Sequence, residues 1–105
     1  MIIYGLKSCD SCRKAKQALP GAEVVDIRAD GLPDDVRAAA LNRFGAALIN
    51  RRSTTWRGLD EAARELAPEV LLDRHPALMK RPLIVDGDRM VLGWDRTAQA
   101  ALGLV

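Results

Sequence analysis

The feature that most constrains this 105-residue chain is a pair of cysteines, Cys9 and Cys12, placed where a strand pattern changes into a helix pattern. Residues 1–5 have the alternation of a short buried strand that ends at a turn. Good helix formers occupy 11–19, so we expect a helix that begins at or just after Cys9. β-Branched residues at 23–27 predict a second strand, and a strand-helix-strand unit of this length implies parallel pairing with a right-handed crossover.

The middle of the chain has helical patterns only. Pro33, followed by two aspartates, is typical of a helix start, and Gly45 is the expected end of that helix. Two further helices are predicted, at about 59–66 and from 68 to about 74. Their expected buried side chains are Ala62, Ala63, Leu66, Val70 and Leu71.

The C-terminal part returns to strands. Residues 82–85 and 90–92 flank an Asp-Gly-Asp turn, a local hairpin signal, and Asp95 is the expected N-cap of a last helix through residue 101 or 102. The whole pattern predicts an α/β fold with a helical insert between a β-α-β half and a β-β-α half. A chain of this length has little room for a second hydrophobic core, and we therefore expect a single domain over residues 1–105.

Composition excludes several classes of function. The net charge of +2 and a pI near 8.8 are too small for a general nucleic-acid surface, so no direct nucleic-acid binding is expected. No window approaches the ~20 consecutive apolar residues that cross a bilayer, and nothing resembles a signal peptide, so we expect a cytoplasmic protein without a membrane partner. In that compartment a permanent disulfide is disfavoured, and a Cys-x-x-Cys pair indicates catalysis, redox sensing or metal binding.

The chemistry expected at the cysteines follows from their place on the helix. Residues three apart at a helix start lie on the same side, and a modest adjustment brings their sulfurs into disulfide range. The helix N-terminus favours a thiolate, helped by Lys7, Arg13 and Lys14 nearby. Cys9, nearer the helix tip, is the expected attacking thiol, and Cys12, one turn further in, is expected to act second.

Two other interpretations of the cysteines are disfavoured. The two cysteines could supply half of the ligands of a zinc site, but the sequence has no second Cys or His pair. His75 alone cannot complete four ligands, so no metal site is predicted. Two cysteines that merely pack as small apolar side chains are disfavoured by their charged and polar neighbours in the sequence.

Arginines in two loop-like segments, at 50–57 and 80–82, indicate an anion site. A guanidinium there can hold a carboxylate or oxyanion with two hydrogen bonds. For each single arginine, a solvated surface charge is the alternative.

Three segments together resemble the ArsC family of thioredoxin-fold proteins: residues 4–10 around Cys9, residues 52–57, and the Lys-Arg-Pro-Leu run at 80–83. The similarity spans almost the whole chain. Within the family, Thr-Thr-Trp-Arg at 54–57 is similar to the YffB-like reductase branch, whereas residues 8–15 with both cysteines are similar to the Spx branch of redox-sensing regulators.

The resemblance implies a thioredoxin-like fold with a four-stranded mixed sheet, Cys9 as nucleophile and Pro82 as a cis-proline that faces it. It also implies that Arg52 and Arg81 surround a substrate oxyanion. The expected function is a thiol-dependent oxidoreductase, a glutathione-dependent thiol reductase or an arsenate-type reductase. It would have no bound cofactor, glutathione as co-substrate, and glutaredoxin or thioredoxin as partner. The intermediate on Cys9 would be released by Cys12 or by a second glutathione.

The alternative that the resemblance implies is an Spx-like transcriptional regulator. Such a protein binds RNA polymerase, and a disulfide between Cys9 and Cys12 would be its switch.

Overall fold

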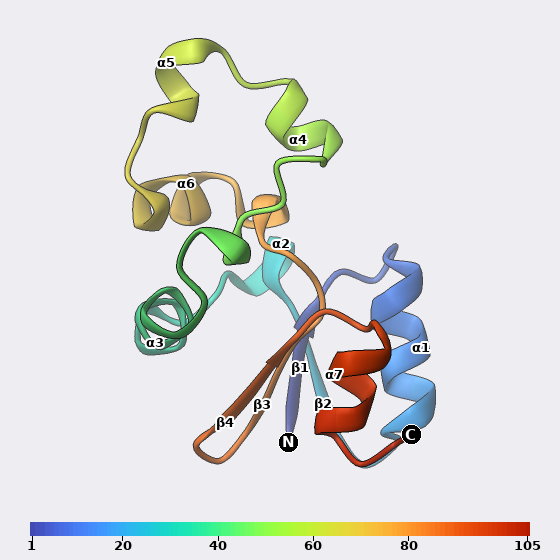
Figure 1. The fold of residues 1–105 in the computed structure, drawn as a ribbon. Coiled ribbons are helices and arrows are strands. Elements are labelled where there is room, and N and C mark those ends of the chain that lie inside the picture. Colours follow the sequence, from blue (N-terminus) through green and yellow to red (C-terminus); the bar gives the residue numbers. More distant parts are fainter. The chain divides into compact units, whose positions relative to one another are not determined.

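The computed structural model describes residues 1–105 and divides the chain into two compact units (Figure 1). Residues Met1–Asp30 and Arg81–Val105 form the first, here called the sheet unit, and Gly31–Lys80 form the second, here called the helical unit. The expectation of one domain over residues 1–105 stays a prediction. No helix in either unit is both long enough and apolar enough to span a bilayer.

The sheet unit contains a four-stranded mixed sheet. Its strands are β1 (Ile2–Gly5), β2 (Glu23–Asp26), β3 (Leu83–Asp86) and β4 (Arg89–Leu92), in the order β2-β1-β3-β4. β1 runs parallel to β2 and antiparallel to β3, which forms the expected hairpin with β4 around Gly87 at φ +60°. The predicted α/β fold class, with a helical insert between its two halves, is confirmed.

Two helices of the sheet unit, α1 (Asp10–Ala18) and α7 (Arg96–Ala101), lie side by side in Figure 1. α7 begins where predicted, because the Asp95 carboxylate accepts a hydrogen bond from the Ala98 N–H at 2.8 Å.

The core of the sheet unit forms where these helices meet the sheet. Ile3, Ile84 and Val91 are opposite one another in adjacent strands and therefore point to the same face. They cluster with Ala15 of α1 and Ala98 of α7, and all five are almost completely buried. Alanines on the helices let the backbones come close to the branched side chains of the sheet.

β2 ends earlier than predicted. Ile27 belongs to a short helix, α2 (Ile27–Asp30), and not to the strand. The Asp26 carboxylate explains the change, because it accepts hydrogen bonds from the N–H groups of Arg28 at 2.9 Å and Ala29 at 3.3 Å and so caps the helical turn.

The helical unit begins with α3 (Asp34–Phe44), preceded by Pro33 as predicted, and Gly45 ends it with φ +55°. α3 packs against α6 (Pro68–Arg74), and the Arg37 guanidinium pairs with Asp34 at 2.9 Å and with Asp73 at 3.6 Å. The remaining elements of this unit are the 3₁₀ turns η1 (Gly45–Leu48) and η2 (Pro76–Leu78) and the short helices α4 (Thr54–Arg57) and α5 (Glu61–Arg64).

Three expectations for the helical unit are wrong. The segment expected to be a loop contains α4, and α5 is shorter than the predicted helix over 59–66. The Ser53 hydroxyl caps α4 by accepting the Trp56 N–H at 3.1 Å. Among the expected buried residues Leu71 is buried, whereas Ala62 is exposed.

Candidate active site

Cys9 is held at the N-terminus of α1 by backbone hydrogen bonds. Its N–H donates to the Leu6 carbonyl at 3.2 Å, and its own carbonyl accepts from the Arg13 N–H at 3.0 Å. Cys9 is the N-cap residue with extended backbone angles, and its side chain is half-buried. The sulfur therefore lies at the positive end of the helix while solvent still reaches it.

Cys12 lies one turn into α1 and is only 5% exposed. It packs against Gly5: a Cβ atom added at Gly5 would lie 3.1 Å from the Cys12 Cβ and closer still to its sulfur. Gly5 ends β1 as expected, just before the turn at 7–8, and it pairs with Asp26. Its missing side chain makes room for the Cys12 thiol, a role for which the sequence alone has no signal, because Cys12 approaches from another element.

The structure brings both cysteines together. Burial alone would raise the pKa of the Cys9 thiol, but the Cys12 thiol and the Cys12 N–H both donate hydrogen bonds to the Cys9 sulfur, and Arg81 adds a hydrogen bond and a positive charge. These contacts outweigh the effect of burial, so the pKa of Cys9 lies below its ordinary value. A lowered pKa increases the fraction of thiolate, which is the nucleophilic form.

The pKa of the Cys12 thiol shifts in the opposite direction, upward. Burial raises its pKa to about 12, and the hydrogen bond that it donates to Cys9 acts in the same direction. Cys12 therefore stays protonated, and its proton is the one that stabilises the Cys9 thiolate.

The cation that acts on Cys9 is Arg81, two residues before the start of β3. Of the three cations expected from the sequence near Cys9, Arg13 instead pairs with the Asp10 carboxylate on the exposed side of α1. Arg81 is more than seventy positions from Cys9 in the sequence, and the fold brings it to the thiol.

The family model described as "ArsC family" matches residues 4–102 of this chain. The chain belongs to the ArsC family.

Two relatives show how this ArsC-family chain compares in sequence. An uncharacterized protein of Haemophilus influenzae is 35% identical over 109 residues, which cover 94% of this chain and 96% of that protein. The global transcriptional regulator Spx of Streptococcus mutans is 32% identical over 98 residues, which cover 84% of this chain and 72% of the regulator.

Solved structures confirm the arsenate-reductase-like fold of this ArsC-family member. The YFFB protein is 31% identical, with a TM-score of 0.75 and coverage of 95% of this chain and 96% of its own. A protein from Streptococcus mutans described as a possible arsenate reductase is 26% identical, with a TM-score of 0.73 and coverage of 97% and 96%.

The other predicted site residues of this ArsC-family chain occupy both units. The Arg81–Pro82 peptide bond is cis, which confirms the predicted cis-proline, and Pro82 is buried in the sheet unit, where its carbonyl accepts the Gly93 N–H at 2.8 Å. Arg52 belongs to the helical unit, so its predicted place around the substrate stays a prediction. No group of three or more His, Cys, Asp and Glu side chains is arranged to hold a metal ion.

Proposed function

We propose that this protein is a thiol-dependent oxidoreductase of the cytoplasm in which Cys9 is the nucleophile. The observation that carries the proposal is the place of Cys9 as the half-buried N-cap residue of α1, where Cys12 and Arg81 lower the pKa of its thiol. A half-buried thiolate stabilised in this way is the reactive species in thiol-disulfide exchange. Membership of the ArsC family, together with the similarity to a protein described as a possible arsenate reductase, supports a reductase.

In the proposed reaction, the Cys9 thiolate attacks the glutathione sulfur of a disulfide between glutathione and a substrate thiol. A mixed disulfide forms on Cys9, and the other sulfur leaves as a thiolate that takes a proton from water. A second glutathione then attacks the mixed disulfide, which releases reduced Cys9 and oxidised glutathione. Glutaredoxin or thioredoxin could supply the same thiol, and an arsenate-type oxyanion is the second substrate class, with Arg52 and Arg81 around its oxygens.

The state of Cys12 favours release by an external thiol. An attacking thiol must be deprotonated, and burial, which does not depend on the state of Cys9, raises the pKa of the Cys12 thiol above its ordinary value. We therefore propose that Cys12 acts first as a hydrogen-bond donor to the Cys9 thiolate, and that glutathione completes the cycle.

The test is turnover of a glutathione mixed disulfide in the presence of excess glutathione, compared among wild type, Cys9→Ser and Cys12→Ser. Cys9→Ser should abolish turnover, while Cys12→Ser should slow it without abolishing it. Mass spectrometry of the stalled enzyme should show one glutathione on Cys9. Full activity of Cys9→Ser would reject the assignment.

A redox-sensing regulator is the second candidate function. The observations that favour it are the similarity to Spx and the hydrogen bond between the two thiols, which are therefore close enough to interact. A regulator of this kind should co-purify with RNA polymerase in a manner that depends on oxidation and should show little turnover with glutathione.

A further inference from the structure

A groove that plays no part in the thiol chemistry lies between helix α1 and the edge strand β2. Its volume is about 210 Å³, and six residues of the sheet unit line it, here together called the α1–β2 groove: Leu6, Lys7, Cys12, Arg13, Lys16 and Val24. The groove is smaller than most small-molecule sites. A cavity of about 150 Å³ holds a benzene molecule, so the α1–β2 groove has the size for one large apolar side chain.

The register of the sheet explains why the groove has an apolar wall. Val24 is opposite Ile3 in the parallel pair, so both side chains point to the same face of the sheet. On that face Ile3 is fully buried in the core that contains Ala15 of α1, whereas Val24 is 45% exposed. β2 is the outermost strand on its side of the sheet, and α1 leaves Val24 uncovered. A large apolar side chain is therefore open to solvent beside the helix.

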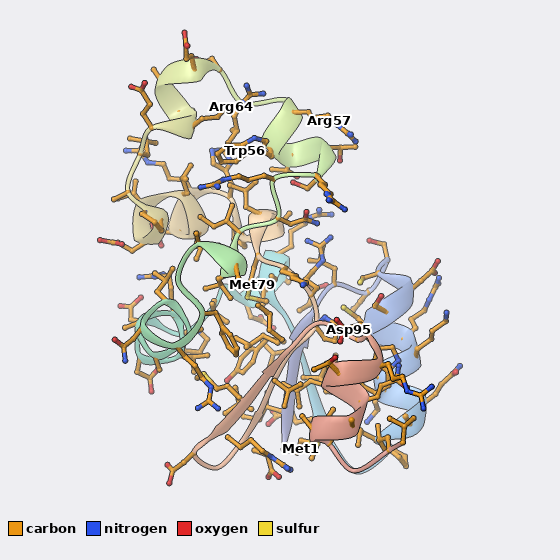
Figure 2. All side chains as sticks on the ribbon, viewed as in Figure 1. Met1, Trp56, Arg57, Arg64, Met79 and Asp95 are labelled. Carbon is orange, nitrogen blue, oxygen red and sulfur yellow. The ribbon has the colours of Figure 1, made fainter.

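The polar side chains of the groove are all positive. Lys7, Arg13 and Lys16 are exposed, and no acidic side chain lines the groove. Arg13 pairs with Asp10, but no carboxylate lies within salt-bridge distance of Lys7 or Lys16. Figure 2 shows nitrogen-tipped side chains along the outer side of α1, the blue helix. The groove thus combines an apolar centre with positive charge that the protein does not cancel, which favours an acidic partner.

Lys16 also holds the two sides of the groove together. Its ammonium group donates to the Pro20 carbonyl at 3.0 Å and to the Ala22 carbonyl at 2.7 Å, which ties α1 to the segment that enters β2. Both acceptors are neutral, so the charge of Lys16 remains. Asp26, the acid on the same face of β2 as Val24, is occupied as the cap of α2. The groove therefore has a fixed frame and keeps its positive charge.

The α1–β2 groove reaches the reactive cysteine through two shared residues. Cys12 lines the groove, and its thiol donates a hydrogen bond to the Cys9 sulfur. Leu6 lines it too, and the Leu6 carbonyl accepts the Cys9 N–H at 3.2 Å. A segment seated in the groove would therefore lie directly beside the residues that hold Cys9.

We propose that the α1–β2 groove is a docking surface for an acidic protein segment. One apolar side chain of the segment packs against Leu6 and Val24, and its carboxylates lie on Lys7 and Lys16. A groove of side-chain size suits a peptide better than a lipid surface, which needs a broad apolar face, and a net charge of +2 is small for nucleic-acid binding. The segment belongs to the protein whose mixed disulfide with glutathione Cys9 attacks, and this assignment alone rests on the proposed function.

Binding is measured with peptides that contain no cysteine, so thiol chemistry plays no part. The reduced, ¹⁵N-labelled protein is titrated with a short peptide that carries glutamates on both sides of one phenylalanine, while backbone amide shifts are followed by NMR. Saturating shifts are expected at Lys7, Arg13 and Val24. A peptide with serine in place of phenylalanine, or with lysines in place of glutamates, should bind about tenfold more weakly.

Val24→Glu and Leu104→Glu form a matched pair of variants. Both residues are exposed large apolar side chains of the sheet unit, but only Val24 lines the groove. Each change adds one negative charge, so general attraction to the peptide falls equally. Val24→Glu should weaken binding of the acidic peptide by about tenfold, because it removes the apolar wall and adds a like charge, and Leu104→Glu should leave the affinity unchanged.

A milder variant keeps the test decisive if Val24→Glu does not fold. Val24→Thr keeps the β-branched shape that suits a strand and should weaken binding by about threefold, the effect of losing one apolar methyl contact. Equal affinity in the Val24 and Leu104 variants, or an absence of shifts at the groove amides, would overturn the site.

Two further probes test the class of partner. Single-stranded DNA and vesicles of anionic lipid should leave the groove amides unshifted. Binding of either one more tightly than the acidic peptide would overturn the assignment to a protein segment.

Glutathionylated peptides test the substrate assignment. A peptide with glutamates and phenylalanine near its cysteine should be turned over with a kcat/KM about tenfold above that of its lysine counterpart, and Val24→Glu should remove this preference. Equal kcat/KM for the two would overturn the substrate assignment. Turnover without binding of the cysteine-free peptide contradicts the docking surface and leaves the proposed function standing, and binding without turnover does the reverse.

Discussion

The thiol of Cys12 fills the space that a side chain at Gly5 would occupy. The last residue of β1 and the first turn of α1 are thus in direct contact through one sulfur atom. The position of that sulfur matters for chemistry because Cys12 donates a hydrogen bond to Cys9.

Gly5→Ala should therefore raise the pKa of Cys9 toward its ordinary value. The added methyl group would overlap with the Cys12 sulfur, so the sulfur must move. The hydrogen bond from Cys12 that stabilises the Cys9 thiolate is then weakened. The rate of Cys9 alkylation by iodoacetamide, measured against pH, should reach its midpoint at a higher pH than in wild type.

The Cys12→Ala background separates this effect from general disruption. Without the sulfur there is no donor to displace, so Gly5→Ala should leave the alkylation midpoint of Cys12→Ala unchanged. An equal shift in both backgrounds would show that Gly5 acts on Cys9 by some other route.

Arg81→Met should also raise the pKa of Cys9, because the Arg81 guanidinium lowers it through a hydrogen bond and a positive charge. Arg81→Lys keeps the charge and should have the smaller effect. The thiolate fraction can be followed by its ultraviolet absorbance during a pH titration, with Arg13→Met as the control, since Arg13 pairs with Asp10. A larger shift in the Arg13 variant would contradict the assignment.

The stability of the protein should fall between pH 9 and 12 because of Cys12. Burial raises the pKa of Cys12 from 9.0 to about 12, so in this range the unfolded chain loses a proton that the folded protein keeps. The free energy of unfolding should therefore fall by about 1.4 kcal/mol for each pH unit in this range. Below pH 9 both states keep the proton, and Cys12 causes no loss of stability. Urea unfolding at several pH values should show a shallower decline in Cys12→Ala, and parallel declines would refute the prediction.

Asp95→Ala should reduce the free energy of unfolding by about 1 kcal/mol, because it removes the N-cap of α7 and leaves the Ala98 N–H without its acceptor. Asp88→Ala is a suitable control, since Asp88 is exposed in the hairpin turn. Chemical denaturation of both variants is the measurement. A loss in Asp88→Ala as large as that in Asp95→Ala would show that charge, and not capping, determines the change.

Local signals made most of the fold predictable. The hairpin around Gly87, the cap at Asp95 and the end of α3 at Gly45 each depend on a few neighbouring residues, and the structure contains all three. α4 could not be predicted in this way. Threonines and tryptophan have modest helix propensity, and the helix depends on Ser53 and on Arg64, which contacts it from another element.

The candidate site was predictable only in part. Both cysteines, and the cis bond at Pro82, were expected from motifs. The sequence did not indicate which cation lowers the pKa of Cys9, because residues close to it in sequence, such as Arg13, carry the same charge as Arg81. The choice depends on Asp10, which engages Arg13, and on the chain reversal that brings β3 beside β1.

The order of strands in the sheet has a consequence for synthesis of the protein. Ile2 pairs with Val85, so β1 obtains its antiparallel neighbour only after the whole helical unit has been made. During translation the parallel β1–β2 pair and α1 precede this neighbour, and the edge of β1 that will receive β3 is open to other strands. The two segments of the sheet unit thus leave the ribosome at different times, with the helical unit between them. Cys9 emerges before Arg81, the arginine that lowers its pKa.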